Sequence, residues 1–297
     1  MQFIFHRSGC KLFFVILLQN DQLKINLKMI KFKKISLTLL IFCGSLLSVQ
    51  AQYTTLNAHS HNDYAQATPF FLAYNAHFGS IEADIWAVDG NLFVAHSKDE
   101  ITAERTLDSL YLWPAVKLFR ANGQKAWKDH GSTYQLLIDL KTAAEPTLLL
   151  LVEQLKKYPD VFNSKANAIR VVITGNRPPP SDFSKYPLFI SFDGNIALKY
   201  DAQQLQRIAL YSENLREYTM WNGKAAIAEK EEKRLRQIID SVHGLNKKIR
   251  FWNAPDEAAA WTTLMKLKVD YLNTDHIQAL SAFLKTGKRK TSRSLRL

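Results

Sequence analysis

Eight short β-rich runs that alternate with helix-prone stretches constrain the fold of this chain more than any other feature. Such alternation favours a parallel sheet, because parallel neighbours need long, usually helical, crossovers. Eight strand–helix units in roughly 250 residues predict a TIM-like (β/α)8 barrel. An open doubly wound sheet is the rival, but no glycine-rich phosphate loop follows the first run. The runs are Thr55–Ser60, Ser80–Ile85, Tyr134–Leu140, Ile169–Thr174, Leu188–Phe192, Ile208–Ser212, Ile249–Asn253 and Tyr271–Thr274, and the helix-prone stretches are Pro69–His77, Leu107–Ala121, Pro146–Tyr158, Ala225–Val242 and Asp256–Leu267.

The N-terminal part of the chain reads as a targeting segment. A basic stretch, the apolar run Ile35–Leu47 and small residues after it predict a signal peptide cleaved near Ala51–Gln52, with translation starting at Met29. An uncleaved membrane anchor is the alternative. We therefore expect a leader over residues 1–51, a single barrel over residues 52–284, and export to the periplasm or the medium.

The net charge of +12 is concentrated at the two ends. The leader carries seven basic residues and one acidic residue, whereas Lys285–Leu297 carries six basic residues and none that is acidic. Because the body between them is balanced, the basicity does not indicate a nucleic-acid partner. We expect residues 285–297 to be a disordered tail with at most weak contact to an anionic membrane surface. Cys10 and Cys43 both lie in the leader, which excludes disulfides and thiol chemistry in the mature domain.

Polar residues gather at the C-terminal ends of the predicted strands, where TIM-barrel active sites lie. Residues two apart on a strand share a face, so His59 lies with His61, and Glu82 with Asp84. Neighbouring buried carboxylates repel each other unless a cation lies between them. Asp139 ends the third run and can complete a site of oxygen ligands, which Mg²⁺ and Ca²⁺ prefer. The alternative is that Glu82 and Asp84 simply pair with Lys or Arg.

A tight hairpin is predicted directly after the second run. Asp89–Gly90 stands between apolar alternations, a strong signal for a two-residue turn. The returning strand would bring His96 back beside the carboxylates, where a histidine suits proton transfer because its unperturbed pKa is ~6.5. Asn176 and Arg177, at the end of the fourth run, are candidate substrate-binding residues. In the string HSHNDY, the residues after His61 are expected to organise a loop.

This series of residues resembles the phospholipase C-like phosphodiesterase superfamily, which includes glycerophosphodiester phosphodiesterases and phosphatidylinositol-specific phospholipases C. The HSHNDY string is similar to a subgroup that contains a fungal mitochondrial-inheritance family and exported bacterial homologues. The resemblance runs from about Asn57 to Ile277 and rests on His59, Glu82-x-Asp84, the Asp-Gly hairpin, His96 and Ile138-Asp139-Leu140-Lys141.

The resemblance implies a TIM-like barrel, a divalent cation (Mg²⁺ or Ca²⁺) and cleavage of a small-molecule or lipid-derived phosphodiester. It implies catalytic roles for His59, His96 and Lys141, cation binding by Glu82, Asp84 and Asp139, and a substrate contact from His61. The chain departs from the glycerophosphodiesterase pattern in three places: Ser60-His61 replaces Arg-Gly, Asp139 replaces Glu, and Ser97 replaces Asp. These departures leave the head group of the substrate open.

A mechanism follows from the chemistry of the ester. One histidine takes a proton from the nucleophile, and the other protonates the leaving alkoxide, while the cation and Lys141 offset the charge on the phosphoryl oxygens. A hydroxyl of the substrate as nucleophile would give a cyclic phosphate first.

Two other classes of protein remain as rivals. An amidohydrolase-like enzyme would use His59 and His61 as transition-metal ligands, but it needs histidines after the middle strands, and only Asp275 and His276 fit. A non-catalytic barrel that binds carbohydrate or lipid would use Trp86, Trp221 and Trp252 as platforms.

Overall fold

The computed structural model describes residues 53–294 except residue 130 and residues 164–167, with side chains described as far as residue 286. The predicted leader, with its signal peptide and cleavage position, lies outside the described residues. The same holds for the last residues of the predicted tail, 295–297.

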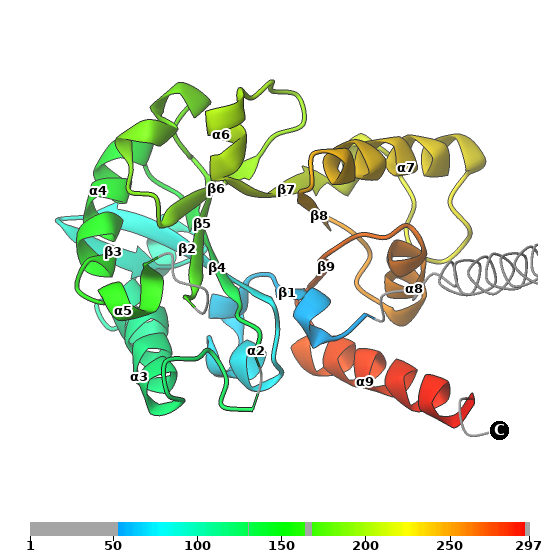
Figure 1. Cartoon of the computed structure of the whole chain (residues 1–297), viewed down its shortest axis with the longest axis horizontal. Coiled ribbons are helices and arrows are strands. Elements are labelled where there is room, and N and C mark those ends of the chain that lie inside the picture. Colours follow the sequence, from blue (N-terminus) through cyan, green and yellow to red (C-terminus); the bar gives the residue numbers. More distant parts are fainter. Residues whose placement is uncertain (1–52, 130, 164–167, 295–297) are drawn as a thin grey trace, which may run out of the picture. The chain divides into compact units, whose positions relative to one another are not determined.

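Eight parallel strands form a nearly closed barrel (Figure 1). Neighbouring strands pair in the order β8-β7-β6-β5-β4-β2-β1-β9, and a parallel bridge between Arg250 and Tyr271 links the two outermost strands. The predicted TIM-like (β/α)8 barrel is thereby confirmed over the open sheet, and each predicted run overlaps one strand. The strands are β1 (Ala58–Ser60), β2 (Ser80–Val88), β4 (Gln135–Leu140), β5 (Arg170–Gly175), β6 (Ile190–Gly194), β7 (Ile208–Asn214), β8 (Lys248–Trp252) and β9 (Leu272–Thr274).

The predicted hairpin extends β2 beyond the barrel. Strand β3 (Asn91–Val94) runs antiparallel to β2, with Val88 opposite Asn91. Both turn residues, Asp89 and Gly90, have positive φ angles of 48° and 76°, as a type I′ turn requires. The chain therefore returns to the C-terminal end of the barrel just before His96.

Helices cover the outside of the strands (Figure 1). Each of the five helix-prone stretches overlaps one α-helix, whereas α5, α6 and α9 were not predicted. At the start of α6, the Asp201 side chain accepts a hydrogen bond from Gln204 N, as in a capping box. None of the described helices is long and apolar enough to cross a membrane. The helices are α2 (Phe71–Asn75), α3 (Trp113–Ala121), α4 (Ala144–Leu155), α5 (Pro159–Phe162), α6 (Ala202–Arg207), α7 (Glu229–Gly244), α8 (Ala258–Lys266) and α9 (Ile277–Ser294).

The last helix extends into the segment for which the sequence predicts a disordered tail. Ile277, Leu280 and Leu284 recur at helical spacing on one face of α9 and are buried. Their packing fixes the first turns of the helix, and the backbone remains helical as far as Ser294.

The interior of the barrel has two zones. Apolar side chains of Leu137, Val172, Leu210 and Tyr271 form a buried cluster of their own, apart from the main core. Glu82 pairs in register with Leu137 and lies on the same side of the sheet, while Asp84 lies two residues further along β2. The apolar cluster therefore forms a floor, and the polar residues lie above it toward the C-terminal ends of the strands.

Candidate active site

A cleft of about 580 Å³ opens at the C-terminal ends of the strands. All the site residues predicted from the sequence line it except two, His59 and Asn176. Asn176 is exposed and outside the lining, whereas Arg177 is part of it. The predicted site residues in the lining are His61, Glu82, Asp84, His96, Asp139, Lys141 and Arg177.

Three carboxylates converge on the floor of this cleft. Asp84 in β2 lies directly opposite Asp139 in β4, and Glu82 lies two residues earlier on the same face as Asp84. One oxygen from each carboxylate lies within 4.8 Å of one from each of the others. Among the described residues, this is the group of three or more acidic, histidine or cysteine side chains that is close enough to hold a metal ion.

The state of Asp84 fits a cation ligand. Its side chain is 1% exposed, and its Oδ1 is buried without a hydrogen-bond partner in the described structure. Burial, together with the charges of Glu82 and Asp139, raises the pKa of Asp84 to about 6. A buried oxygen without a partner is costly unless a ligand satisfies it, and a hard divalent cation is a ligand that carboxylate oxygens bind well.

Basic side chains also compensate the carboxylates, as the alternative interpretation of the sequence expects. Lys141 Nζ donates to Asp84 Oδ2 and to Asp139 Oδ2, in both cases at 2.9 Å. Arg250 Nη1 donates to Glu82 Oε2 at 2.8 Å. Burial alone would raise the pKa of Glu82, but Arg250 and the hydrogen bond from His59 hold that pKa well below its usual range.

His96 and Tyr64 form one wall of the site. His96 Nδ1 lies 3.0 Å from the Tyr64 hydroxyl and 3.6 Å from Asp84 Oδ2, and its side chain is 66% exposed. The Tyr64 hydroxyl donates to Asp84 Oδ2 at 2.8 Å. Burial, followed by the negative charge of Asp84, raises the pKa of Tyr64, which therefore stays a neutral donor. Tyr64 thus contacts the site directly, a role that the sequence interpretation of HSHNDY missed.

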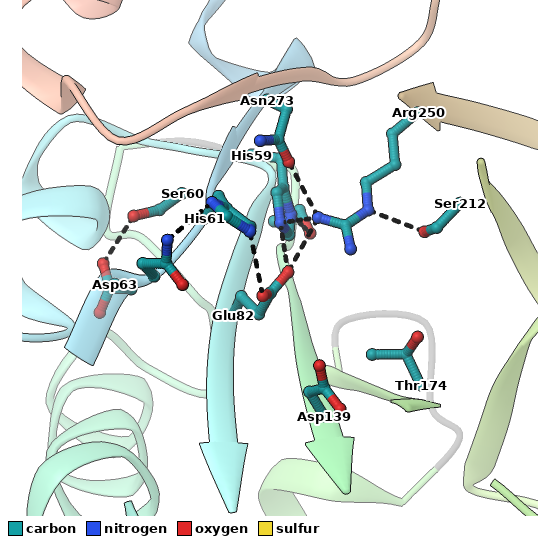
Figure 2. Close-up of polar contacts among 12 residues, drawn as sticks. His59, Ser60, His61, Asp63, Glu82, Asp139, Thr174, Ser212, Arg250 and Asn273 are labelled. Atoms are coloured by element: carbon teal, nitrogen blue, oxygen red, sulfur yellow. Dashed lines mark hydrogen bonds and ion pairs between the residues drawn. The ribbon is translucent and has the colours of Figure 1, made fainter. Parts of the chain in front are cut away.

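His59, in β1, and His61, just after it, occupy different environments (Figure 2). His59 is fully buried, with Nδ1 2.7 Å from Ser80 Oγ and Nε2 against Glu82 Oε2 and Arg250 Nη1. Burial, then the charge of Arg250, lowers the pKa of His59 to about 3. This position does not fit the predicted exchange of a proton with substrate, because both ring nitrogens face other side chains and neither faces the cleft.

His61, which follows β1, lines the cleft. Its Nδ1 lies 2.9 Å from Asp275 Oδ1, and its Nε2 faces Glu82 Oε1 at 3.9 Å. Burial works against protonation, but the hydrogen bond to Asp275 and the charge of Glu82 raise the pKa of His61. A carboxylate on Nδ1 fixes the ring and leaves Nε2 for proton transfer.

Two protein-family models match segments of this chain that contain residues of the site. Residues 47–179 match the AIM6-like phosphodiesterase domain, and residues 248–278 match the glycerophosphoryl diester phosphodiesterase family. Altered inheritance of mitochondria protein 6 from Eremothecium gossypii is 26% identical over 76% of this chain and 68% of its own length. The protein of the same name from Saccharomyces cerevisiae is 27% identical over 81% of this chain and 74% of its own length.

The chain is a relative of this fungal family within the phospholipase C-like phosphodiesterases. The predicted resemblance is thereby confirmed. The names of the fungal relatives state no reaction. Among solved structures, a phosphodiesterase from Oleispira antarctica, described in complex with the product sn-glycerol-3-phosphate, matches with a TM-score of 0.47 and 12% identity over 77% of this chain and 95% of its own.

Both matched segments contribute residues to the cleft. The AIM6-like segment contains His59, His61, the three carboxylates and Lys141. The glycerophosphoryl diester phosphodiesterase segment contains Arg250, Trp252 and Asn273. Arg250 and Trp252 line the cleft. Arg250 was not predicted from the sequence, and Trp252 was named only as a platform of the non-catalytic alternative.

A fourth buried carboxylate, Asp193, lies in the cleft on the side of β6. Its Oδ2 accepts a hydrogen bond from Thr174 Oγ1 at 2.9 Å. Burial raises the pKa of Asp193 to about 6, although Arg177 and Arg250 act in the opposite direction. Ionisation of Asp193 therefore lowers the free energy of unfolding.

We expect Asp193→Asn to stabilise the protein by about 2 kcal/mol at about pH 8. The amide keeps the hydrogen bond from Thr174 and removes the buried charge. Because the folded pKa lies above the unfolded pKa of 3.8, wild-type stability falls as pH rises from about 4 to 6, and the advantage of the variant grows over the same window. Urea unfolding at about pH 4 and about pH 8 measures both. An advantage that does not depend on pH would contradict the buried-charge explanation.

Proposed function

We propose that this protein is an exported, divalent-cation-dependent phosphodiesterase that cleaves a small-molecule or lipid-derived phosphodiester of the glycerophosphodiester or phospholipid-head-group type. The observation that carries the proposal is the convergence of Glu82, Asp84 and Asp139 on the cleft floor, with one histidine on each side. His61 lies beside Glu82 and His96 beside Asp84. The family relationship supports the reaction class.

The carboxylates would hold Mg²⁺ or Ca²⁺, which supplies positive charge to the phosphoryl oxygens when it is bound. Lys141, held between Asp84 and Asp139, adds a fixed positive charge at the same place. His61 and His96 transfer the protons of the reaction. One takes the proton of the nucleophile, either water or a hydroxyl of the substrate, and the other gives a proton to the leaving alkoxide. His59 orients Glu82 from below and stays out of contact with substrate.

The amidohydrolase-like alternative is less well supported by this geometry. It requires His59 and His61 to share a transition metal. His59 Nε2 faces Glu82 and Arg250, and the Nδ1 of His61 is bound to Asp275. Among the described residues, the group of potential metal ligands contains carboxylates and no histidine.

The test is a substrate panel assayed with purified mature protein. Glycerophosphodiesters with different alcohols and phospholipid head-group diesters are assayed beside a phosphomonoester and an amide. We expect diester cleavage alone, lowered more than about 10²-fold by a chelator and restored by Mg²⁺ or Ca²⁺. Cleavage of the amide with stoichiometric zinc would favour the amidohydrolase-like enzyme, and full diester cleavage in excess chelator would contradict the cation site.

A further inference from the structure

A buried arginine reaches the cleft from the side opposite Lys141. Arg250 lies in β8 with a side chain that is only 5% exposed. Its Nε donates to Ser212 Oγ at 2.7 Å, and its Nη1 donates to Glu82 Oε2 at 2.8 Å and to Asn273 Oδ1 at 3.0 Å. Partners on three other strands or strand ends therefore fix the plane of the guanidinium.

One nitrogen of this guanidinium is left over. No hydrogen bond from Nη2 to a described residue is present, although Nε and Nη1 both have partners. Figure 2 shows this nitrogen turned toward the space that Glu82, Asp139 and Thr174 border. All three of these residues line the same cleft as Arg250.

We propose that Arg250 Nη2 binds a phosphoryl oxygen of the substrate, across the carboxylate group from Lys141. The inference rests on the proposed phosphodiesterase function. A guanidinium is planar, always charged and suited to phosphate oxygens, and a side chain already held in place loses little entropy on binding. Arg250 is therefore a catalytic residue contributed by the strand next to the closure of the barrel.

The charges that contact the carboxylate group agree with this assignment. The three carboxylates, Lys141 and Arg250 carry one net negative charge when all are ionised. A divalent cation changes that sum to one net positive charge, which a single phosphodiester anion neutralises. If Arg250 served only as a counter-charge for Glu82, the cation would make it redundant, and a buried arginine is costly to keep for that purpose alone.

The experiment measures binding of inorganic phosphate by titration calorimetry in saturating Mg²⁺. We expect Arg250→Met to weaken phosphate binding by about 10–100-fold, because a charged hydrogen-bond donor is lost. Mg²⁺ affinity, measured separately, should stay equal or increase, since a positive charge next to Glu82 is removed. Arg236→Met, which removes an exposed arginine paired with Glu232 on α7, is the matched control and should change neither.

A second variant covers the case in which Arg250→Met fails to fold. Asn273→Ala keeps the guanidinium but removes one of its anchors, and should weaken phosphate binding by about 3–10-fold with Mg²⁺ affinity unchanged. Wild-type phosphate affinity in a folded Arg250→Met, or in Asn273→Ala, would overturn the inference even if the protein cleaves phosphodiesters. Conversely, Arg250-dependent phosphate binding in a protein that cleaves no diester would refute the proposed function and leave the anion site standing.

Discussion

Asp139→Asn is expected to lower phosphodiester turnover by about 10³-fold without unfolding the protein. Asp139 is the best of the three carboxylates to test. Its side chain accepts a hydrogen bond from Lys141 and is 20% exposed. Asparagine keeps the shape but removes one anionic oxygen of the cation site. Turnover at saturating Mg²⁺ and Mg²⁺ binding by calorimetry should fall together. Normal Mg²⁺ binding in this variant would rule Asp139 out as a ligand.

The matched control is Asp182→Asn. Asp182 is also a carboxylate paired with a lysine, Lys185, at 3.0 Å, but it lies outside the lining of the cleft. Its replacement should leave both turnover and Mg²⁺ binding at the wild-type level. A loss of activity equal to that of Asp139→Asn would show that the effect is not specific to the cation site.

A steric variant tests the same carboxylate without changing its charge. A Cβ on Gly175 would lie 1.8 Å from Asp139 Oδ1, so Gly175→Ala must displace the carboxylate. Gly175 also has a φ of +68°, where alanine is strained. Gly123→Ala carries the same kind of strain, with a φ of +73° and nothing within 4 Å of its Cβ position. Loss of Mg²⁺ binding in Gly175→Ala but not in Gly123→Ala would assign the effect to crowding of Asp139 and the adjacent Leu140 carbonyl, and not to backbone strain.

Local signals in the sequence predicted the barrel and part of the cleft. The hairpin followed from Asp89–Gly90, and the shared face of Glu82 and Asp84 from the two-residue period of a strand. Both arguments need only neighbouring residues. Strand pairing fixes the register that sets Asp84 opposite Asp139. Consecutive strands of a barrel usually lie side by side, so the sequence already predicted that these two carboxylates are neighbours.

The role of Arg250 could not be predicted from neighbouring residues. In the predicted run Ile249–Asn253 it is the one basic residue, and its partner Glu82 is 168 positions away. Only closure of the barrel brings β8 near β1 and β2. The depth of each side chain in the barrel could not be predicted either. A two-residue period gives the face on which a side chain lies, but not its distance from the C-terminal end of the barrel. His59 and His61 were predicted on one face, yet β1 ends at Ser60, so His59 lies within the strand and His61 beyond it.

His61→Ala is expected to lower kcat by about 10²–10⁴-fold with little effect on stability. His61 is in the cleft, and its side chain is 27% exposed, so its loss removes a proton-transfer group without opening a cavity in the core. Thermal unfolding and turnover are measured on the same preparation. Wild-type turnover in His61→Ala would contradict its role as a proton-transfer group.

His59→Ala should show the opposite balance. Its loss leaves a buried cavity and takes a partner from both Ser80 and Glu82, which should cost about 2–4 kcal/mol of stability. Added imidazole separates the two roles. It can enter the cleft and should partly restore turnover in His61→Ala, whereas the site of His59 is closed to solvent and should not respond. Imidazole rescue of His59→Ala, with none of His61→Ala, would return the proton-transfer role to His59, as the resemblance implied.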